Sequence, residues 1–146
     1  MKKIFWIVIS LITCNCFSQI DNKNSVENSL IGKWCGTDYS EHSGCTILDD
    51  KGFVTFTSKD RTFGGENYQY GDKNYIYKYI IDYSNSPILL DFIVYVKGIE
   101  KEEKHFKSIV RFLDKNTIEM RTGEKKYPKR FSSKKDKRTI ILKRVE

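Results

Sequence analysis

Residues 75–97 read YIYKYIIDYSNSPILLDFIVYVK and contain two runs in which apolar and polar side chains alternate. A period of two places successive side chains on opposite faces of a β-strand. Lys78 and Asp82 fall opposite the tyrosines of the first run, and Asp91 and Lys97 fall opposite the aliphatic residues of the second. We therefore predict two antiparallel strands, joined by a loop at Pro87, with their apolar faces turned inward. Those faces carry Tyr75, Tyr77, Tyr79, Ile81 and Tyr83 in the first strand and Ile88, Leu90, Phe92, Val94 and Val96 in the second.

Similar short runs fill the rest of the chain, and no segment has the period of an amphipathic helix. Turns rich in Asp, Gly and Asn separate the runs, for example at 49–52 and 71–74, and such turns favour hairpins. A sheet of this size must curl to protect its edges. We predict an all-β, antiparallel up-and-down meander that closes into a barrel of about eight strands, with a seven-stranded sandwich as the alternative. The expected strands span residues 30–36, 45–48, 53–58, 68–70, 75–83, 88–97, 105–113, 117–122 and 139–145.

The N-terminal segment is interpreted separately from the domain. Residues 1–18 begin with two lysines, continue with an apolar run and end in small and polar residues, which is typical of a secretory signal peptide. The apolar run is about half as long as a membrane-crossing helix, so no transmembrane segment is expected in the mature chain. Cys14 follows a partial lipobox, which leaves lipid anchoring as an alternative. We predict export to the periplasm or beyond, a flexible leader over 19–29 and one domain over 30–146.

Two cysteines remain in the domain, Cys35 and Cys45. An even pair in an exported protein indicates a disulfide, and closing a loop of about ten residues stabilises the fold by roughly 2–3 kcal/mol in the chain-entropy model. The alternative is a metal site that includes His42, which lies between the cysteines. Zinc needs further ligands at suitable spacing, and the other histidine is His105. We expect the disulfide, and neither a metal nor a cofactor.

The charge is spread unevenly along the chain. The 146 residues carry a formal net charge of +7, and 39% are hydrophobic and 31% charged, which suits one domain with a core and argues against disorder. Residues 20–96 contain 7 basic and 11 acidic side chains, whereas residues 97–146 contain 17 basic and 8 acidic ones. The basic excess is densest in a loop near the C-terminus. Its basic residues are Lys125, Lys126, Lys129, Arg130, Lys134, Lys135, Lys137 and Arg138.

This basic loop supports two interpretations. It could dock on an acidic membrane surface or an acidic protein partner, because each basic residue near such a surface adds to the attraction. Alternatively, it is a solvated hairpin loop whose lysines keep the protein soluble and its edges unpaired. A nucleic acid partner is not expected, since an exported domain rarely meets one.

Several stretches resemble a known family. The motif LIGKW at residues 30–34 resembles the Gly-x-Trp element that opens lipocalin-type barrels. The pattern over 79–92, and the ending in which 127–132 precede a last strand finishing at 142–144, look like small bacterial lipocalin-like domains of uncharacterised function. The resemblance covers most of 30–146.

The resemblance implies a lipocalin-like barrel and a structural role for two residues. In lipocalins the motif tryptophan closes one end of the barrel and a basic residue from a late strand stacks on it. Trp34 and Arg144 would form this pair, and such a cation–π contact contributes about 0.5–2 kcal/mol. The domain is shorter than the larger lipocalins, which leaves open whether the barrel is hollow.

The inward aromatic residues are the clearest indication of function. They could line a cavity of roughly 300 Å³ or more for a small flat or aliphatic ligand, with phenol hydroxyls orienting it. Alternatively they are an aromatic core that fills the barrel. The sequence has no phosphate-binding glycine loop, nucleophile elbow or zincin spacing, and Asp82 and Asp91 lie on the face assigned to solvent, so we expect a binding module and no enzyme. The candidate ligand-binding residues are Tyr75, Tyr77, Tyr79, Tyr83, Phe92, Phe106 and Phe112.

Overall fold

The computed structural model describes residues 29–37, 41–99, 102–132 and 138–146. The predicted signal peptide over 1–18, its Cys14, and all of the predicted leader except Ser29 lie outside the described residues. Within the part that is described, no helix is both long and apolar enough to cross a membrane. The strands are β1 (Gly32–Thr37), β2 (Ser43–Leu48), β3 (Val54–Ser58), β4 (Arg61–Gly64), β5 (Tyr68–Tyr70), β6 (Lys73–Asp82), β7 (Ile88–Val96), β8 (Glu102–Asp114), β9 (Thr117–Gly123) and β10 (Thr139–Val145).

All strands belong to one antiparallel sheet in the order β4-β3-β2-β1-β10-β9-β8-β7-β6-β5. The first strand pairs with the last, so the meander curls round on itself, and its two outer strands are β4 and β5. This confirms the all-β antiparallel meander and excludes the two-sheet sandwich for the described residues. The predicted count of about eight is wrong, because these residues form ten strands. The strand missing from the prediction is β4, which follows a tight turn where Lys59 has a φ of 51°.

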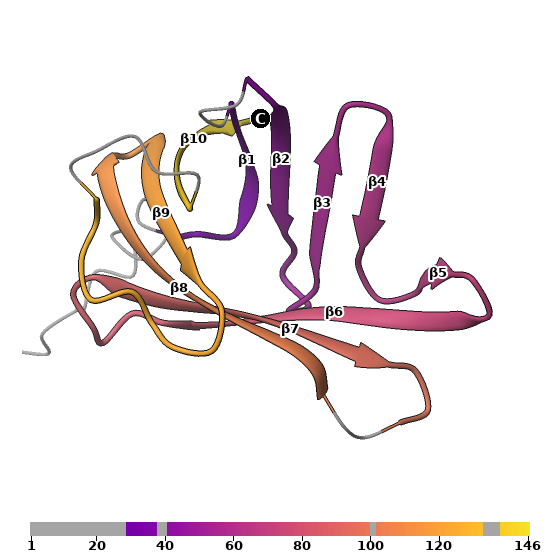
Figure 1. Ribbon diagram of the computed structural model, residues 1–146. Helices are drawn as coiled ribbons and strands as arrows, with labels where there is room; N and C mark the ends of the chain where they lie inside the picture. The colour runs from indigo at the N-terminus through magenta and orange to yellow at the C-terminus, as the bar shows by residue number, and fades with distance from the viewer. Residues whose placement is uncertain (1–28, 38–40, 100–101, 133–137) are drawn as a thin grey trace, which may run out of the picture.

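The sheet nearly closes into a barrel at the seam between β4 and β5. An isolated bridge pairs Phe53, just before β3, with Lys78 in the middle of β6, and the N–H of Tyr77 donates to the carbonyl of Gly65 over 2.9 Å. The neighbouring Gly64 has a φ of 104°, and an added Cβ there would collide with backbone of the adjacent strand. Away from these contacts β3 and β4 rise from the long strands β6 and β7, so the barrel stays open on this side (Figure 1).

The core lies on the inner face of the sheet and is centred on Trp34, which is 1% exposed. The indole Nε1 donates to the carbonyl of Leu30 over 2.8 Å, and the guanidinium of Arg144 lies 4.2 Å from the ring centroid. Arg144 also donates to the carbonyl of Ile31 over 3.0 Å. This is the tryptophan–arginine contact that the resemblance implies. The buried core comprises Leu30, Trp34, Leu48, Val54, Leu90, Phe92, Val110, Ile118, Met120 and Leu142.

A disulfide joins the first two strands. Cys35 on β1 lies directly opposite Cys45 on β2, and the two are bonded. The predicted disulfide is therefore confirmed, and it indicates an oxidising, non-cytoplasmic compartment. Both sulfurs are used in this bond, so they do not form the alternative metal site with His42.

The segment after β9 returns across the outer side of the sheet next to β8 (Figure 1). The ring of Tyr127 lies 4.9 Å from the ammonium of Lys107, and the ring of Phe131 lies 4.5 Å from the guanidinium of Arg111. Both basic residues belong to β8, so two cation–π contacts fasten the segment to this strand. We refer to residues 124–132 as the strap.

The strap buries part of the outer face. Ile109, which lies between the two strap contacts along β8, is only 2% exposed, and the side chain of Asp91 is 14% exposed. The prediction that Asp91 faces solvent is therefore wrong, because the strap covers the outward-pointing carboxylate. Burial raises the pKa of Tyr127 to about 12, and the nearby carboxylate of Asp91 adds to this shift by hydrogen bonding and by its charge.

Candidate functional site

Aromatic side chains from β3, β4, β5, β6 and β7 gather on the inner face beside the open seam. Phe56 stacks on Phe63 with ring centroids 5.3 Å apart and packs edge-on against Phe92 at 5.4 Å. Tyr77 packs edge-on against Phe63 at 6.3 Å and against Tyr68 at 5.9 Å. Strand register explains the first contact, since Phe56 and Phe63 are directly opposite in the β3–β4 hairpin.

Two adjoining cavities open over these rings. One has a volume of about 350 Å³ and is lined mostly by the rings of Phe56, Phe63, Tyr77, Phe92 and Phe106, together with Met120. The other, of about 330 Å³, lies toward the sheet edge and is lined mainly by Phe63, Tyr68, Tyr70, Tyr75 and Tyr77. The two share Phe63, Tyr77, Val94 and Lys104 in their linings, so they lie side by side, and we name them together the aromatic cleft.

Four of the seven predicted ligand-binding residues line the aromatic cleft. They come from three adjacent strands, β6, β7 and β8, and their side chains share the inner face because each sits at an inward position of its strand. The cross-strand pairing of β7 with β8 places Phe92 opposite Phe106. The four residues are Tyr75, Tyr77, Phe92 and Phe106.

The other three predicted residues have different surroundings. The hydroxyl of Tyr79 donates to the carbonyl of Asp49, which ties β6 to the turn before β3. Tyr83 lies in the turn after β6, is 49% exposed, and accepts a hydrogen bond from the N–H of Leu30 over 2.8 Å. Its predicted inward position is wrong because the alternation ends with the strand at residue 82. Phe112 packs edge-on against the buried indole, with centroids 6.2 Å apart.

Several cleft residues were not predicted: Phe56, Phe63, Tyr68, Tyr70 and Met120. For Phe56 and Phe63, the sequence contains a pattern that could have predicted them. They are placed symmetrically about the two-residue turn at 59–60, and that spacing makes two aromatic residues direct partners in a hairpin. The tyrosines of β5 had no comparable signal, because a strand of three residues carries too little periodicity.

The rim of the cleft carries opposite charges that a β-bulge places there. Val94 of β7 is opposite Lys104 of β8, whereas the next residue, Tyr95, is opposite Glu102, so Glu103 is the extra residue. Glu103 and Lys104 therefore both line the cleft, instead of pointing to opposite faces as neighbours in a regular strand do. The cleft has an aromatic floor and a charged edge.

The phenol of Tyr77 is a neutral group in this environment. Burial raises its pKa, and the neighbouring Tyr68, Tyr75 and Glu103 raise it further. At neutral pH this hydroxyl therefore keeps its proton and is able to act both as a hydrogen-bond donor and as an acceptor for a bound molecule.

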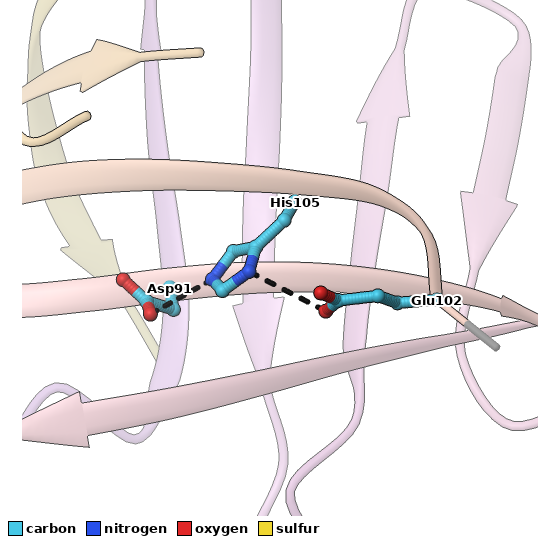
Figure 2. Close-up of polar contacts among 3 residues, drawn as sticks. All are labelled: Asp91, Glu102 and His105. Atoms are coloured by element: carbon cyan, nitrogen blue, oxygen red, sulfur yellow. Dashed lines mark hydrogen bonds and ion pairs between the residues drawn. The ribbon is translucent and has the colours of Figure 1, made fainter. Parts of the chain in front are cut away.

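The same bulge creates a charged cluster on the outer face, shown in Figure 2. His105 Nε2 lies 2.9 Å from Asp91 Oδ2, and His105 Nδ1 lies 3.4 Å from Glu102 Oε2. Residues three apart in a regular strand point to opposite faces, and the bulge brings Glu102 and His105 to the same one. In the described parts of the chain, no group of three His, Cys, Asp or Glu side chains is placed to hold a metal ion. The two carboxylates occupy both ring nitrogens, so this cluster fastens β7 to β8.

The basic loop is only partly described. Lys125, Lys126, Lys129, Arg130 and Arg138 are exposed. Lys134, Lys135 and Lys137 lie outside the described residues. The loop is not simply a solvated connection, because its aromatic residues dock on β8 as part of the strap.

Comparison of the chain with family models, with curated proteins and with solved structures finds no match. The described residues form a barrel-like antiparallel sheet with an aromatic cleft.

Proposed function

We propose that this protein is an exported binding module, of lipocalin-like type, that holds a small apolar ligand in the aromatic cleft. The observation that carries the proposal is the pair of adjoining cavities, of about 350 and 330 Å³, whose linings share Phe63 and Tyr77. Ligand sites in proteins are typically concave, of a few hundred cubic ångströms, and lined by apolar and aromatic side chains with few polar groups.

The chemistry of the walls favours a flat or aliphatic body. The rings of Phe56, Phe92 and Phe106 offer apolar surface, and stacked or edge-on aromatic contacts favour a planar group. The hydroxyl of Tyr77 and the ammonium of Lys104 are the polar groups that would orient the ligand.

The open seam supplies an entrance. Because β4 and β5 do not pair with each other, the part of the cleft lined by Tyr68 and Tyr70 lies at the edge of the sheet. Tyr70 is 68% exposed, which suits a residue at the mouth of a site.

The partners of the polar groups favour a binding protein over an enzyme. In the described residues, His105 has carboxylates at both ring nitrogens, and the cysteines of β1 and β2 are joined to each other. A nucleophilic mechanism needs a hydroxyl or thiol within hydrogen-bond reach of a base, and His105 has no such partner in this part of the chain.

A fluorescent apolar probe, N-phenyl-1-naphthylamine, tests the proposal. The test variant is Lys104→Trp, which puts an indole over the cleft at a position whose side chain is exposed. The matched control is Lys78→Trp, which makes the same change at an exposed position on the outer face of β6. We expect the wild type to bind the probe, and Lys104→Trp to weaken binding by at least about tenfold, equal to about 1.4 kcal/mol.

The control should bind within about twofold of the wild type, a difference of about 0.4 kcal/mol. Absence of probe binding by the wild type, or equal weakening in both variants, would contradict a ligand site in the aromatic cleft. Far-ultraviolet circular dichroism of both variants verifies that the sheet is intact.

A further inference from the structure

The two cavities of the aromatic cleft differ in chemistry. The one of about 330 Å³, which we call the tyrosine cavity, has four tyrosine rings and the carboxylate of Glu103 in its lining. The one of about 350 Å³, which we call the phenylalanine cavity, is lined mostly by phenylalanine rings, and Lys104 is the one charged residue among the described residues that line it. The two cavities therefore suit different parts of a ligand. The four tyrosines are Tyr68, Tyr70, Tyr75 and Tyr77.

The tyrosine rings border their cavity from more than one side. Pairing of β5 with β6 places Tyr68 directly opposite Tyr75. The rings of Tyr68 and Tyr70 are nearly parallel, with 15° between their planes and 6.5 Å between their centroids. The ring of Tyr77 stands at 87° to that of Tyr68, with centroids 5.9 Å apart. Because Tyr70 is 68% exposed, a group in solution can reach these rings from the edge of the sheet.

The face of an aromatic ring carries negative electrostatic potential and attracts a cation. One such contact strengthens binding by roughly twofold to 30-fold, depending on how completely the cation is removed from water. A quaternary ammonium group suits a site of several rings, because it has no N–H to donate and gains more from ring faces than from hydrogen-bond acceptors.

The charged residues direct a cation to the tyrosine cavity. There Glu103 and Lys104 cancel in net charge, so the rings decide the preference. Burial raises the pKa of the Tyr77 phenol, and Tyr68, Tyr75 and Glu103 raise it further, which is consistent with a carboxylate close to the rings. In the phenylalanine cavity the described lining includes no carboxylate, so Lys104 repels a cation there.

We propose that the tyrosine cavity binds a quaternary ammonium group while the apolar body of the same molecule fills the phenylalanine cavity. The ligand is then a cationic amphiphile. This ammonium site rests on the proposed function, because the same cleft holds the apolar body.

Two probes of the same shape test the preference for a cation. They are meta-hydroxyphenyl-trimethylammonium and its neutral counterpart meta-tert-butylphenol, in which carbon replaces the charged nitrogen. Each is titrated by isothermal titration calorimetry into the protein purified from its own host, at about pH 6, where both phenols keep their protons. We expect the ammonium to bind at least about tenfold more tightly than the neutral probe.

Two exposed neighbours on β8 supply a matched pair of variants. Glu103→Gln removes the carboxylate of the tyrosine cavity. Its control, Glu102→Gln, makes the same change in net charge at a residue that is outside this lining and lies beside His105 on the outer face. Glu103→Gln should weaken the ammonium about fivefold and change the neutral probe by less than about twofold, whereas the control should change both by less than about twofold.

Two further variants test the rings and the opposing charge. Tyr70→Leu removes one exposed ring and should reduce the preference for the ammonium over the neutral probe by about threefold. Lys104→Met removes the opposing charge and keeps a long side chain, so it should strengthen binding of the ammonium by about threefold. Weaker binding of the ammonium by Lys104→Met would contradict the proposed site.

Equal binding of the two probes would overturn the ammonium site and leave the apolar site of the proposed function standing. Equal weakening by Glu103→Gln and Glu102→Gln would also overturn it, because the attraction would then come from net charge alone. N-phenyl-1-naphthylamine, measured on the same protein, reports separately on the proposed function. If it binds and the ammonium does not, only the ammonium site is wrong, and if none of the three probes binds, both proposals are wrong.

Discussion

Replacing Trp34 by alanine should remove a large part of the stability of the domain. The indole is 1% exposed, and Trp→Ala changes in protein cores typically cost about 3–5 kcal/mol. Two features place the expected loss at Trp34 toward the upper end of this range. Without Nε1 the buried carbonyl of Leu30 loses its donor, which by itself costs about 1–3 kcal/mol, and Arg144 loses the ring on which it stacks.

Urea unfolding followed by far-ultraviolet circular dichroism measures this loss, because Trp34 is the only tryptophan of the predicted domain and its fluorescence disappears with the substitution. Trp34→Phe keeps most of the ring but not the donor, so it should cost about 1–3 kcal/mol. Ile141→Ala, at a 47% exposed position on β10, serves as the control and should cost less than about 1 kcal/mol. A loss below about 1 kcal/mol for Trp34→Ala would refute the role of the indole as the centre of the core.

Three further changes test other parts of the structure. Replacing Cys35 and Cys45 together by serine should lower the free energy of unfolding by about 2–3 kcal/mol, and an unchanged melting temperature would show that the bond does not constrain the chain. The pKa of Tyr127 is about 12 in the folded protein and ordinarily 10.0, so its stabilising contribution is complete below pH 10 and disappears as the pH rises towards 12. Tyr127→Phe should therefore lose less stability than the wild type over this range in urea titrations, and an equal loss would contradict the burial of the phenol between the strap and the sheet. Arg111→Met leaves the 8% exposed Glu119 without its partner and should cost about 1–3 kcal/mol in thermal unfolding, whereas adding Glu119→Met should recover part of the loss.

The antiparallel meander could be predicted because the strongest patterns come from strands with one inward face. β6 and β7 are long enough for the alternation over 75–83 and 88–97 to fix which side chains point inward. The short strands β4 and β5 carry only a few residues each, and they supply Phe63, Tyr68 and Tyr70 to the cleft wall. The predicted residues that line the cleft, Tyr75, Tyr77, Phe92 and Phe106, therefore all come from β6, β7 and β8, and the prediction of a ligand site there remains a proposal.

The strap and the bulge were harder to predict, for two physical reasons. The strap is indicated only by apolar residues on the outward face, such as Ile93 and Ile109, which are 5% and 2% exposed. A strand that is apolar on both faces is one that is covered on both faces, and this signal was present in residues 88–96. The bulge at Glu103 lies in a run of charged residues. Without alternating apolar residues, the sequence there gives no sign of a shift in strand register.

The central claim, a ligand in the aromatic cleft, is tested most directly by the methyl group of Met120. The chain has two methionines, Met1 and Met120, and the second is 8% exposed and lines the cleft. In protein labelled with ¹³C-methyl methionine, the Met120 signal should move when N-phenyl-1-naphthylamine is added, and in Lys104→Trp the same movement should need about tenfold more probe. If the probe binds to the wild type while the Met120 signal does not move, the ligand lies elsewhere and the account of the cleft is wrong.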